Sequence, residues 1–230
     1  MAETLDAGLA RRWWRALTEN SVGLLEDSAC LLTAGSAGRA RSLQVLAMEE
    51  LAKALWIYED SEDIWSSGGV QVRLADDFEK AARSHLSKLA WALTADSTLE
   101  VFWGDYSSRR ELEDLSPEGL AAFATEMFEA YKDSARALNK TKQAGLYVDR
   151  VGEELHLPAD VPADGLADEI VRTARVALML LIQDHSRMKE AAGQSRYDST
   201  HDLQNRLMAL GYPDEVSPQP SEGGDSLSDG

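Results

Sequence analysis

The chain has 230 residues, 44% of them hydrophobic, which is enough for one packed core or for a domain with an appendage. Its formal net charge is -17, from 40 acidic and 23 basic residues, and this disfavours a broad nucleic-acid groove because such grooves are basic. A single cysteine and a longest purely apolar run of VALMLLI (176–182) favour a cytoplasmic protein without disulfides or membrane contact.

The first half of the chain is predicted to be helical. Apolar residues recur at helical spacing, and the Gly-containing segment 33–38 separates the first two runs. This spacing predicts three helices, at 3–34, 37–59 and 71–95. An irregular stretch, 96–115, follows them.

The second half is predicted to hold two further long helices and a tail. Ser116 and Pro117 form a favourable helix start, and the fourth helix is expected to end near residue 144. After a short extended segment and a turn-rich connector, a fifth helix is expected over 165–192 and a short sixth over 201–210. Residues 213–230 are acidic without any base and are predicted to be a disordered tail after a helical domain, 1–212.

Polar residues fall at positions that the pattern assigns to the core of this all-α bundle. On LQVLAMEELAKALWIYE (43–59), Glu50 lies between Ala47 and Ala54 on the apolar face. The same helical spacing of apolar residues places Asn20 and Asp27 inward on the first helix, and His85 inward on the third. Burying a carboxylate is costly unless it is paired, so we expect these groups to satisfy one another.

These residues and their neighbours are the candidate site. Its proposed catalytic members are Glu50, Lys53, His85 and Lys88, and its supporting polar set is Asn20, Asp27 and Glu49. The competing interpretation is structural: a solvated Glu49–Lys53 pair contributes only ~0.3–0.5 kcal/mol, and His85 alone fits a structural role.

A set of short motifs occurs along the chain in a fixed order: Asn20, LLEDSACLL (24–32), Gly35, RARSL (39–43), EELAK (49–53), HLSK (85–88) and KQAGLYVD (142–149). In this order the motifs resemble those of AbiV-family abortive infection proteins, which belong to the HEPN superfamily. The resemblance covers about residues 17–160. It implies a HEPN-like helical bundle and a bacterial anti-phage protein that halts growth or translation in an infected cell.

Many HEPN proteins are metal-independent ribonucleases that act as dimers and carry an Arg and a His four to six residues apart. Two pairs here have that spacing, Arg150 with His156 and Arg196 with His201, but neither is placed like the helix-borne pair of an active nuclease. A nuclease site is therefore expected at His85 instead.

Two functions remain open. In the first, an RNA-cleaving effector, His85 is the general acid/base, Lys53 or Lys88 stabilises the phosphoryl oxyanion and Glu50 orients the imidazole, with no metal or cofactor. In the second, a non-catalytic regulator binds a phage or host translation component. A carboxylate-bridged metal site is poorly supported, because Glu50 is followed three residues later by a lysine instead of a histidine.

Partners follow from the resemblance and from the surface. The expected partners are RNA or the translation machinery, a phage-encoded activator or an antitoxin, and a second copy of the chain. The homodimer is also indicated by Trp13 and Trp14, which cannot both face one core. Lys142, Tyr147 and Asp149 are candidate binding residues, because they lie where the fourth helix ends.

Overall fold

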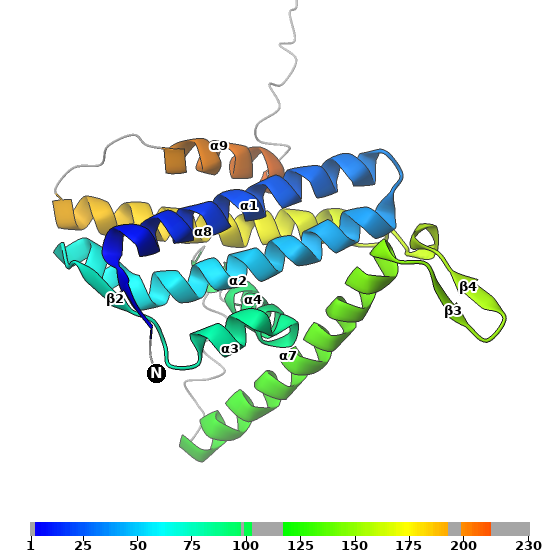
Figure 1. The fold of residues 1–230 in the computed structure, drawn as a ribbon, viewed down its shortest axis with the longest axis horizontal. Coiled ribbons are helices and arrows are strands. Elements are labelled where there is room, and N and C mark those ends of the chain that lie inside the picture. The colour runs from blue at the N-terminus through cyan, green and yellow to red at the C-terminus, as the bar shows by residue number, and fades with distance from the viewer. Residues whose placement is uncertain (1–2, 98, 103–116, 193–198, 213–230) are drawn as a thin grey trace, which may run out of the picture.

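The computed structural model describes residues 3–97, 99–102, 117–192 and 199–212. Its frame is a long antiparallel pair of helices, α1 (Ala7–Thr33) and α2 (Ala37–Ser67) (Figure 1). Gly35 in the connecting turn has a φ of 76°, a left-handed conformation that glycine adopts without steric cost. This turn reverses the chain and lays α2 along α1.

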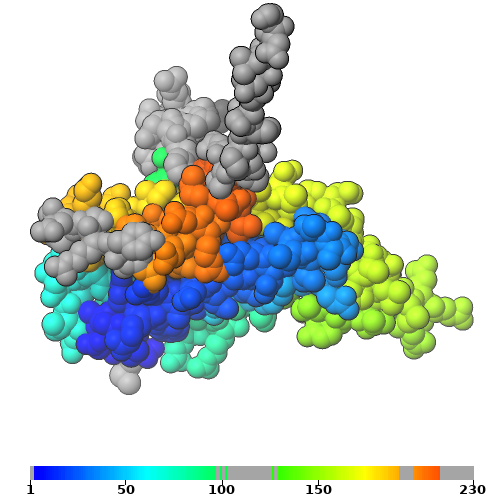
Figure 2. Space-filling model, turned by 90° about the horizontal axis from the view of Figure 1, so that it is seen from above, coloured from blue at the N-terminus to red at the C-terminus, as the bar shows by residue number. Residues whose placement is uncertain are grey.

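The main core lies between this pair and two helices from the end of the described chain. Helix α8 (Leu166–Ala192) packs against both α1 and α2, and α9 (Ser199–Gly211) covers α8 and α1 (Figures 1 and 2). The largest fully buried apolar side chains of this core include Trp14, Leu25, Leu51, Ile57, Leu178, Leu180, Leu181 and Leu207.

A second, smaller core lies on another side of α2. Helices α4 (His85–Ser97) and α7 (Pro117–Leu146) pack on α2 and on each other. Their shared apolar cluster contains Val45, Met48, Ala52, Leu89, Ala90, Ala92 and Ala135. Because α2 contributes to both cores, it is buried on two sides. A helix that packs against one core alone would expose one of these sides to solvent.

The remaining elements are short. Helices α3 (Phe78–Arg83) and α5 (Leu99–Phe102) flank α4. Strand β1 (Thr4–Asp6) pairs antiparallel with β2 (Gln71–Arg73), and β3 (Asp149–Val151) pairs antiparallel with β4 (Glu154–His156) before a 3-10 turn, η1 (Pro158–Asp160). The β3–β4 hairpin projects beyond one end of the bundle (Figures 1 and 2).

The all-α bundle predicted from the sequence is confirmed, and its fourth, fifth and sixth helices lie close to their expected bounds. The third predicted helix, 71–95, was wrong in its start and its continuity, because this range holds β2 and then two helices, α3 and α4. Its first residues pair with β1, and Ser84 interrupts the rest because its Oγ accepts the Ser87 N–H at 3.2 Å and caps α4. The loop expected from residue 61 was also wrong, since α2 continues to Ser67. The tail 213–230 and most of the stretch 96–115 lie outside the described residues.

Both adjacent tryptophans pack within the chain, Trp14 fully buried and Trp13 partly buried. Trp14 is fully buried against Tyr58 and Trp65, and Trp13 packs edge-on against Phe78 with ring centroids 5.5 Å apart. The pair therefore does not supply the exposed apolar surface on which the expected homodimer partly rested. None of the described helices combines the length and apolar character needed to cross a membrane.

Candidate functional site

A buried carboxylate, Glu49 on α2, is the centre of the candidate site. Its side chain is 2% exposed and contacts three cationic or titratable groups from two other helices. Its Oε2 lies 2.7 Å from Lys88 Nζ and 2.7 Å from His85 Nδ1, and its Oε1 lies 2.5 Å from Lys142 Nζ. We call these four residues the Glu49 cluster.

The neighbouring lysines keep the carboxyl group of Glu49 ionised. Burial opposes ionisation and raises the pKa of this carboxyl, but hydrogen bonds from Lys142, Lys88 and His85 outweigh burial, and the net pKa lies below its ordinary value of 4.5. Glu49 is therefore a carboxylate at neutral pH. With two lysines against one carboxylate, the cluster carries a formal charge of about +1 when the imidazole is neutral.

His85 is the member of the cluster that reaches solvent. Its side chain is 53% exposed, whereas those of Lys88 and Lys142 are 9% and 8% exposed. Because His85 and Lys88 are three residues apart at the start of α4, both side chains lie on the helix face that meets α2. The positive end of the α4 dipole lies at the same place.

A close helix crossing positions Lys142. Helices α2 and α7 meet at Gly38 and Gly145. A methyl group on Gly145 would collide with the backbone carbonyl of Gly38, and one on Gly38 would collide with the carbonyl of Pro158 in η1. Ser42 Oγ donates to the Lys142 carbonyl oxygen at 2.8 Å, which ties this turn of α7 to α2. The backbones approach closely enough for Lys142 to reach Glu49.

The structure brings together only part of the predicted catalytic set. His85 and Lys88 meet at Glu49, but Glu50 pairs with Lys53 on its own helix, at 2.6 Å, with both side chains partly exposed. The assignment of Glu50 to the inner position was wrong, because α2 also packs against α4 and α7, which buries the Glu49 side of the helix.

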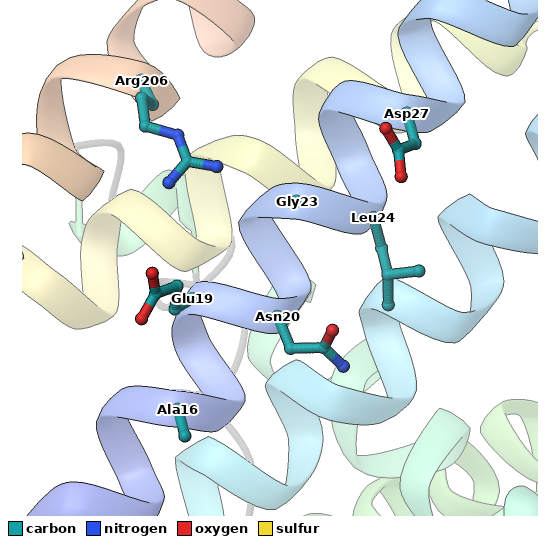
Figure 3. Close-up of a pocket in the computed structure, with 7 residues that line it drawn as sticks. All are labelled: Ala16, Glu19, Asn20, Gly23, Leu24, Asp27 and Arg206. Carbon is teal, nitrogen blue, oxygen red and sulfur yellow. The ribbon is translucent and has the colours of Figure 1, made fainter.

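The inward placement of Asn20 and Asp27 was also wrong. Both residues are exposed on α1, whose buried face contains instead Leu17, Ser21 and Leu25. Asn20 and Asp27 line a shallow pocket of about 450 Å³ between α1 and α9, separate from the Glu49 cluster. Figure 3 shows its lining: Ala16, Glu19, Asn20, Gly23, Leu24, Asp27 and Arg206.

The predicted binding residues are divided between the cluster and the surface. Lys142 belongs to the Glu49 cluster, while Tyr147, which is 65% exposed, and Asp149 follow the end of α7 in solvent. Arg150 and His156, one of the Arg–His pairs, lie on opposite strands of the exposed β3–β4 hairpin.

The sequence contained a signal for Glu49. Val45 and Ala52, four residues before it and three after it, are buried in the second core, so a stripe through residues 45, 49 and 52 runs down one side of α2. Two apolar stripes on one helix predict burial on two sides. Nothing in the spacing indicated that Lys142, 93 residues away, is the partner of Glu49.

The arrangement is chemically suited to proton transfer. A buried carboxylate that accepts the Nδ1–H of an imidazole fixes the ring and leaves Nε2 as a proton acceptor. Because the ring is half exposed, a ligand can approach it from solvent. The ammonium groups of the cluster hold Glu49 in its ionised form, which preserves this hydrogen bond.

In a comparison with known families, the family model HEPN_AbiV, described as AbiV, matches residues 9–178. The matched region contains all four residues of the Glu49 cluster. No curated protein and no solved structure matches the chain.

Proposed function

The chain belongs to the AbiV family of HEPN abortive infection proteins, and from this premise we propose that it arrests growth by cleaving RNA, with His85 as the proton-transfer group. The observation that carries the proposal is the exposed His85 imidazole, hydrogen-bonded through Nδ1 to the buried carboxylate of Glu49 at 2.7 Å. Such a pair orients the ring for general acid–base work.

The proposed reaction uses the RNA itself as nucleophile. Nε2 of His85 takes the proton of a ribose 2′-OH as its oxygen bonds to the adjacent phosphorus, and the phosphorus–O5′ bond breaks. The imidazolium then gives the proton to the departing O5′. The products are a 2′,3′-cyclic phosphate and a 5′-hydroxyl, so atoms and protons balance without a metal or cofactor.

The positive charges of the lysines support this reaction without direct contact with the phosphate. Lys88 and Lys142 are buried against Glu49, so direct contact with phosphate would require those ion pairs to open. Their excess charge, together with the N-terminus of α4, favours a phosphate beside His85. This replaces the oxyanion contact first expected of Lys88.

RNA is the proposed ligand of the surface beside the cluster. Tyr147 lies five residues after Lys142, directly after the last residue of α7, Leu146. Its exposed ring offers a base a stacking surface, a contact worth ~1–3 kcal/mol in proteins that bind single strands. The carboxylate of Asp149, two residues further on, disfavours a second phosphate and so limits the path of the strand.

A non-catalytic regulator is the second candidate. The net charge of -17 favours it, since an acidic body repels extended RNA and suits a protein partner with a basic surface. In that case the Glu49 cluster is a scaffold, and the effector binds a phage or host translation component elsewhere.

Induced expression of wild type, His85→Ala and His85→Gln separates the two candidates. Growth and total RNA are followed in cells, and the melting temperature of each purified protein is measured. We expect wild type to arrest growth and fragment RNA, and both variants to melt near wild type while doing neither. His85→Gln keeps a side-chain hydrogen-bond donor for Glu49 but cannot exchange a proton.

Two results would contradict the proposal. Full arrest and RNA fragmentation by well-folded His85→Ala protein would remove His85 from the reaction. Arrest by wild type with intact RNA would favour the regulator.

A further inference from the structure

The end of the β3–β4 hairpin that joins α7 carries a second group of exposed polar and aromatic side chains. Asp149 begins β3, and His156, the last residue of β4, lies directly opposite it in the antiparallel register. Residues opposed in a hydrogen-bonded pair lie about 5.5 Å apart at Cα, and their side chains share one face of the sheet. Both side chains are exposed. A carboxylate and an imidazole therefore lie side by side just beyond the end of α7.

Tyr147 adds an aromatic surface next to this pair. Its side chain is 65% exposed, and it precedes Asp149 by two residues, the spacing at which side chains of an extended segment point to the same side. The backbone N–H of Tyr147 still donates to the Gln143 carbonyl oxygen at 3.0 Å, in the last turn of α7. The same helix holds Lys142 against Glu49. The aromatic ring is therefore carried by a helix that reaches the Glu49 cluster.

The carboxylate of Asp149 is fixed in direction and keeps free acceptor sites. Its Oδ1 accepts the backbone N–H of Arg150 at 2.7 Å. A carboxylate has about four acceptor sites, and no other donor from the part of the chain that the structure describes contacts Asp149. The remaining sites can accept hydrogen bonds from a ligand.

We propose that Tyr147, Asp149 and His156 form a guanine subsite for the RNA strand that is cleaved at His85. This inference rests on the function proposed above and adds to it the base that is recognised. Along its Watson–Crick edge, guanine presents the acceptor O6 and two neighbouring donors, the N1–H and the 2-amino group. The two donors meet the Asp149 carboxylate, an imidazole N–H of His156 donates to O6, and the purine ring stacks on Tyr147.

The acceptor-only character of a carboxylate selects guanine among the four bases. Adenine and cytosine each carry a ring acceptor beside the amino group, and this acceptor would face the negative charge of Asp149. Uracil has one ring N–H between two carbonyl oxygens, which the carboxylate repels. Guanine alone offers two neighbouring donors to one carboxylate. Discrimination of this kind comes from repulsion of the wrong base as well as from attraction of the right one.

Binding of short RNA strands tests the subsite in the full-length chain. The protein carries His85→Gln, which is expected to prevent cleavage, and the strands are oligoadenosines with guanosine or adenosine at one central position. In NMR titrations, the guanosine strand should bind at least ~10-fold more tightly, and adding Asp149→Asn should reduce this preference to about 2-fold or less. Asparagine keeps the acceptor for the Arg150 N–H but replaces one acceptor oxygen with a donor group.

Glu153→Gln is the matched control. Glu153 is an exposed acid in the hairpin turn, so its replacement removes the same charge outside the proposed subsite. This variant should keep the full guanine preference. Equal affinity of the parent protein for the two strands, or an unchanged preference after Asp149→Asn, would overturn the proposal. Equal loss of preference in both variants would also overturn it, because net charge would then explain the result.

Two further measurements separate this inference from the function on which it rests. Guanosine monophosphate should bind less tightly than the guanosine strand, and equal affinity would overturn the assignment of the subsite to RNA in favour of a free nucleotide. Cleavage of RNA by wild type is scored separately. Guanine preference without cleavage would contradict the proposed reaction and support the subsite, whereas cleavage without guanine preference would contradict the subsite alone.

Discussion

Two adjacent glutamates on α2 have opposite environments. Glu49 is buried and holds two lysines and a histidine, while Glu50 makes a partly exposed pair with Lys53 within one turn of the same helix. The difference arises from their directions around the helix, since successive residues point about 100° apart. Glu49 therefore links three helices, whereas Glu50 pairs within its own helix.

The contrast predicts different costs of removing each charge. Glu49→Gln leaves two buried ammonium groups without their counter-ion and should lower the free energy of unfolding by ~3–5 kcal/mol. Glu50→Gln, the matched control, should lower it by ~0.5 kcal/mol or less. Urea denaturation of the two variants measures both values. Equal losses would mean that the Glu49 cluster does not hold α2, α4 and α7 together.

The lowered pKa of Glu49 predicts a pH dependence. A carboxyl whose pKa is lower in the folded chain than its ordinary 4.5 stabilises the fold above that pH, and this stabilisation disappears as the pH falls through the folded pKa. The stability advantage of wild type over Glu49→Gln should therefore be full at neutral pH and shrink below pH 4.5. An advantage that stays constant over this acid range would contradict the assignment.

Sequence reasoning found the types of residue in the site better than their directions. The helical spacing of His85 and Lys88 predicts that they lie close together, and both contact Glu49. The predicted inward position of His85 was wrong, because its side chain is 53% exposed. A single apolar stripe on α2 predicts that Glu50 is the inner residue and Glu49 the outer one, but the helix has two such stripes. The sequence indicates Lys142 only as a candidate binding residue at the end of the fourth helix, because its contact with Glu49 depends on tertiary packing.

At the scale of elements, the crossing of α2 and α7 controls the position of Lys142. Gly38 and Gly145 let the two backbones meet with no side chain between them. Any added volume there must separate the helices and draw the ammonium group away from Glu49.

Gly145→Ala should therefore destabilise the chain by ~1–3 kcal/mol, the usual cost of overpacking. Gly23→Ala is the matched control: it lies inside α1, and a methyl group there meets nothing within 4 Å. Its lower backbone entropy in the unfolded chain should make it stabilising by ~0.5–1 kcal/mol. Thermal or urea unfolding of both variants checks the signs. A stabilised Gly145→Ala would show that the crossing is loose.

The long helices could be predicted because each carries several turns of periodic apolar residues. The breaks between them could not be placed as well. Ser84 ends one helix and caps the next with a single side-chain hydrogen bond. The pairing of β1 with β2 joins residues 4–6 to 71–73, which are separated in the sequence by the whole of α1 and α2. Such contacts leave little trace in local periodicity.

At the scale of the whole molecule, α2 separates a large apolar core from a smaller one that contains the Glu49 cluster. The cluster is locally cationic in a chain whose net charge is -17. Long-range electrostatics therefore oppose RNA, while the field beside His85 favours one phosphate. Under the proposed function, the approach of RNA to the site must therefore depend on local contacts.

This charge distribution predicts weak general affinity for RNA. Filter binding of His85→Gln protein to a generic single strand at physiological salt should give a Kd of ~100 μM or weaker, the weak end of non-specific nucleic-acid binding. A submicromolar Kd would show that an extended basic surface operates despite the net charge.

Analysis of RNA ends tests the role of His85 most directly. Purified full-length wild type and His85→Gln proteins are incubated with RNA, and the termini of any fragments are identified. We predict fragments with 2′,3′-cyclic phosphate and 5′-hydroxyl ends from wild type, and none above background from the folded variant. Cleavage by His85→Gln at the wild-type rate, or no cleavage by wild-type protein that arrests growth in cells, would contradict the account.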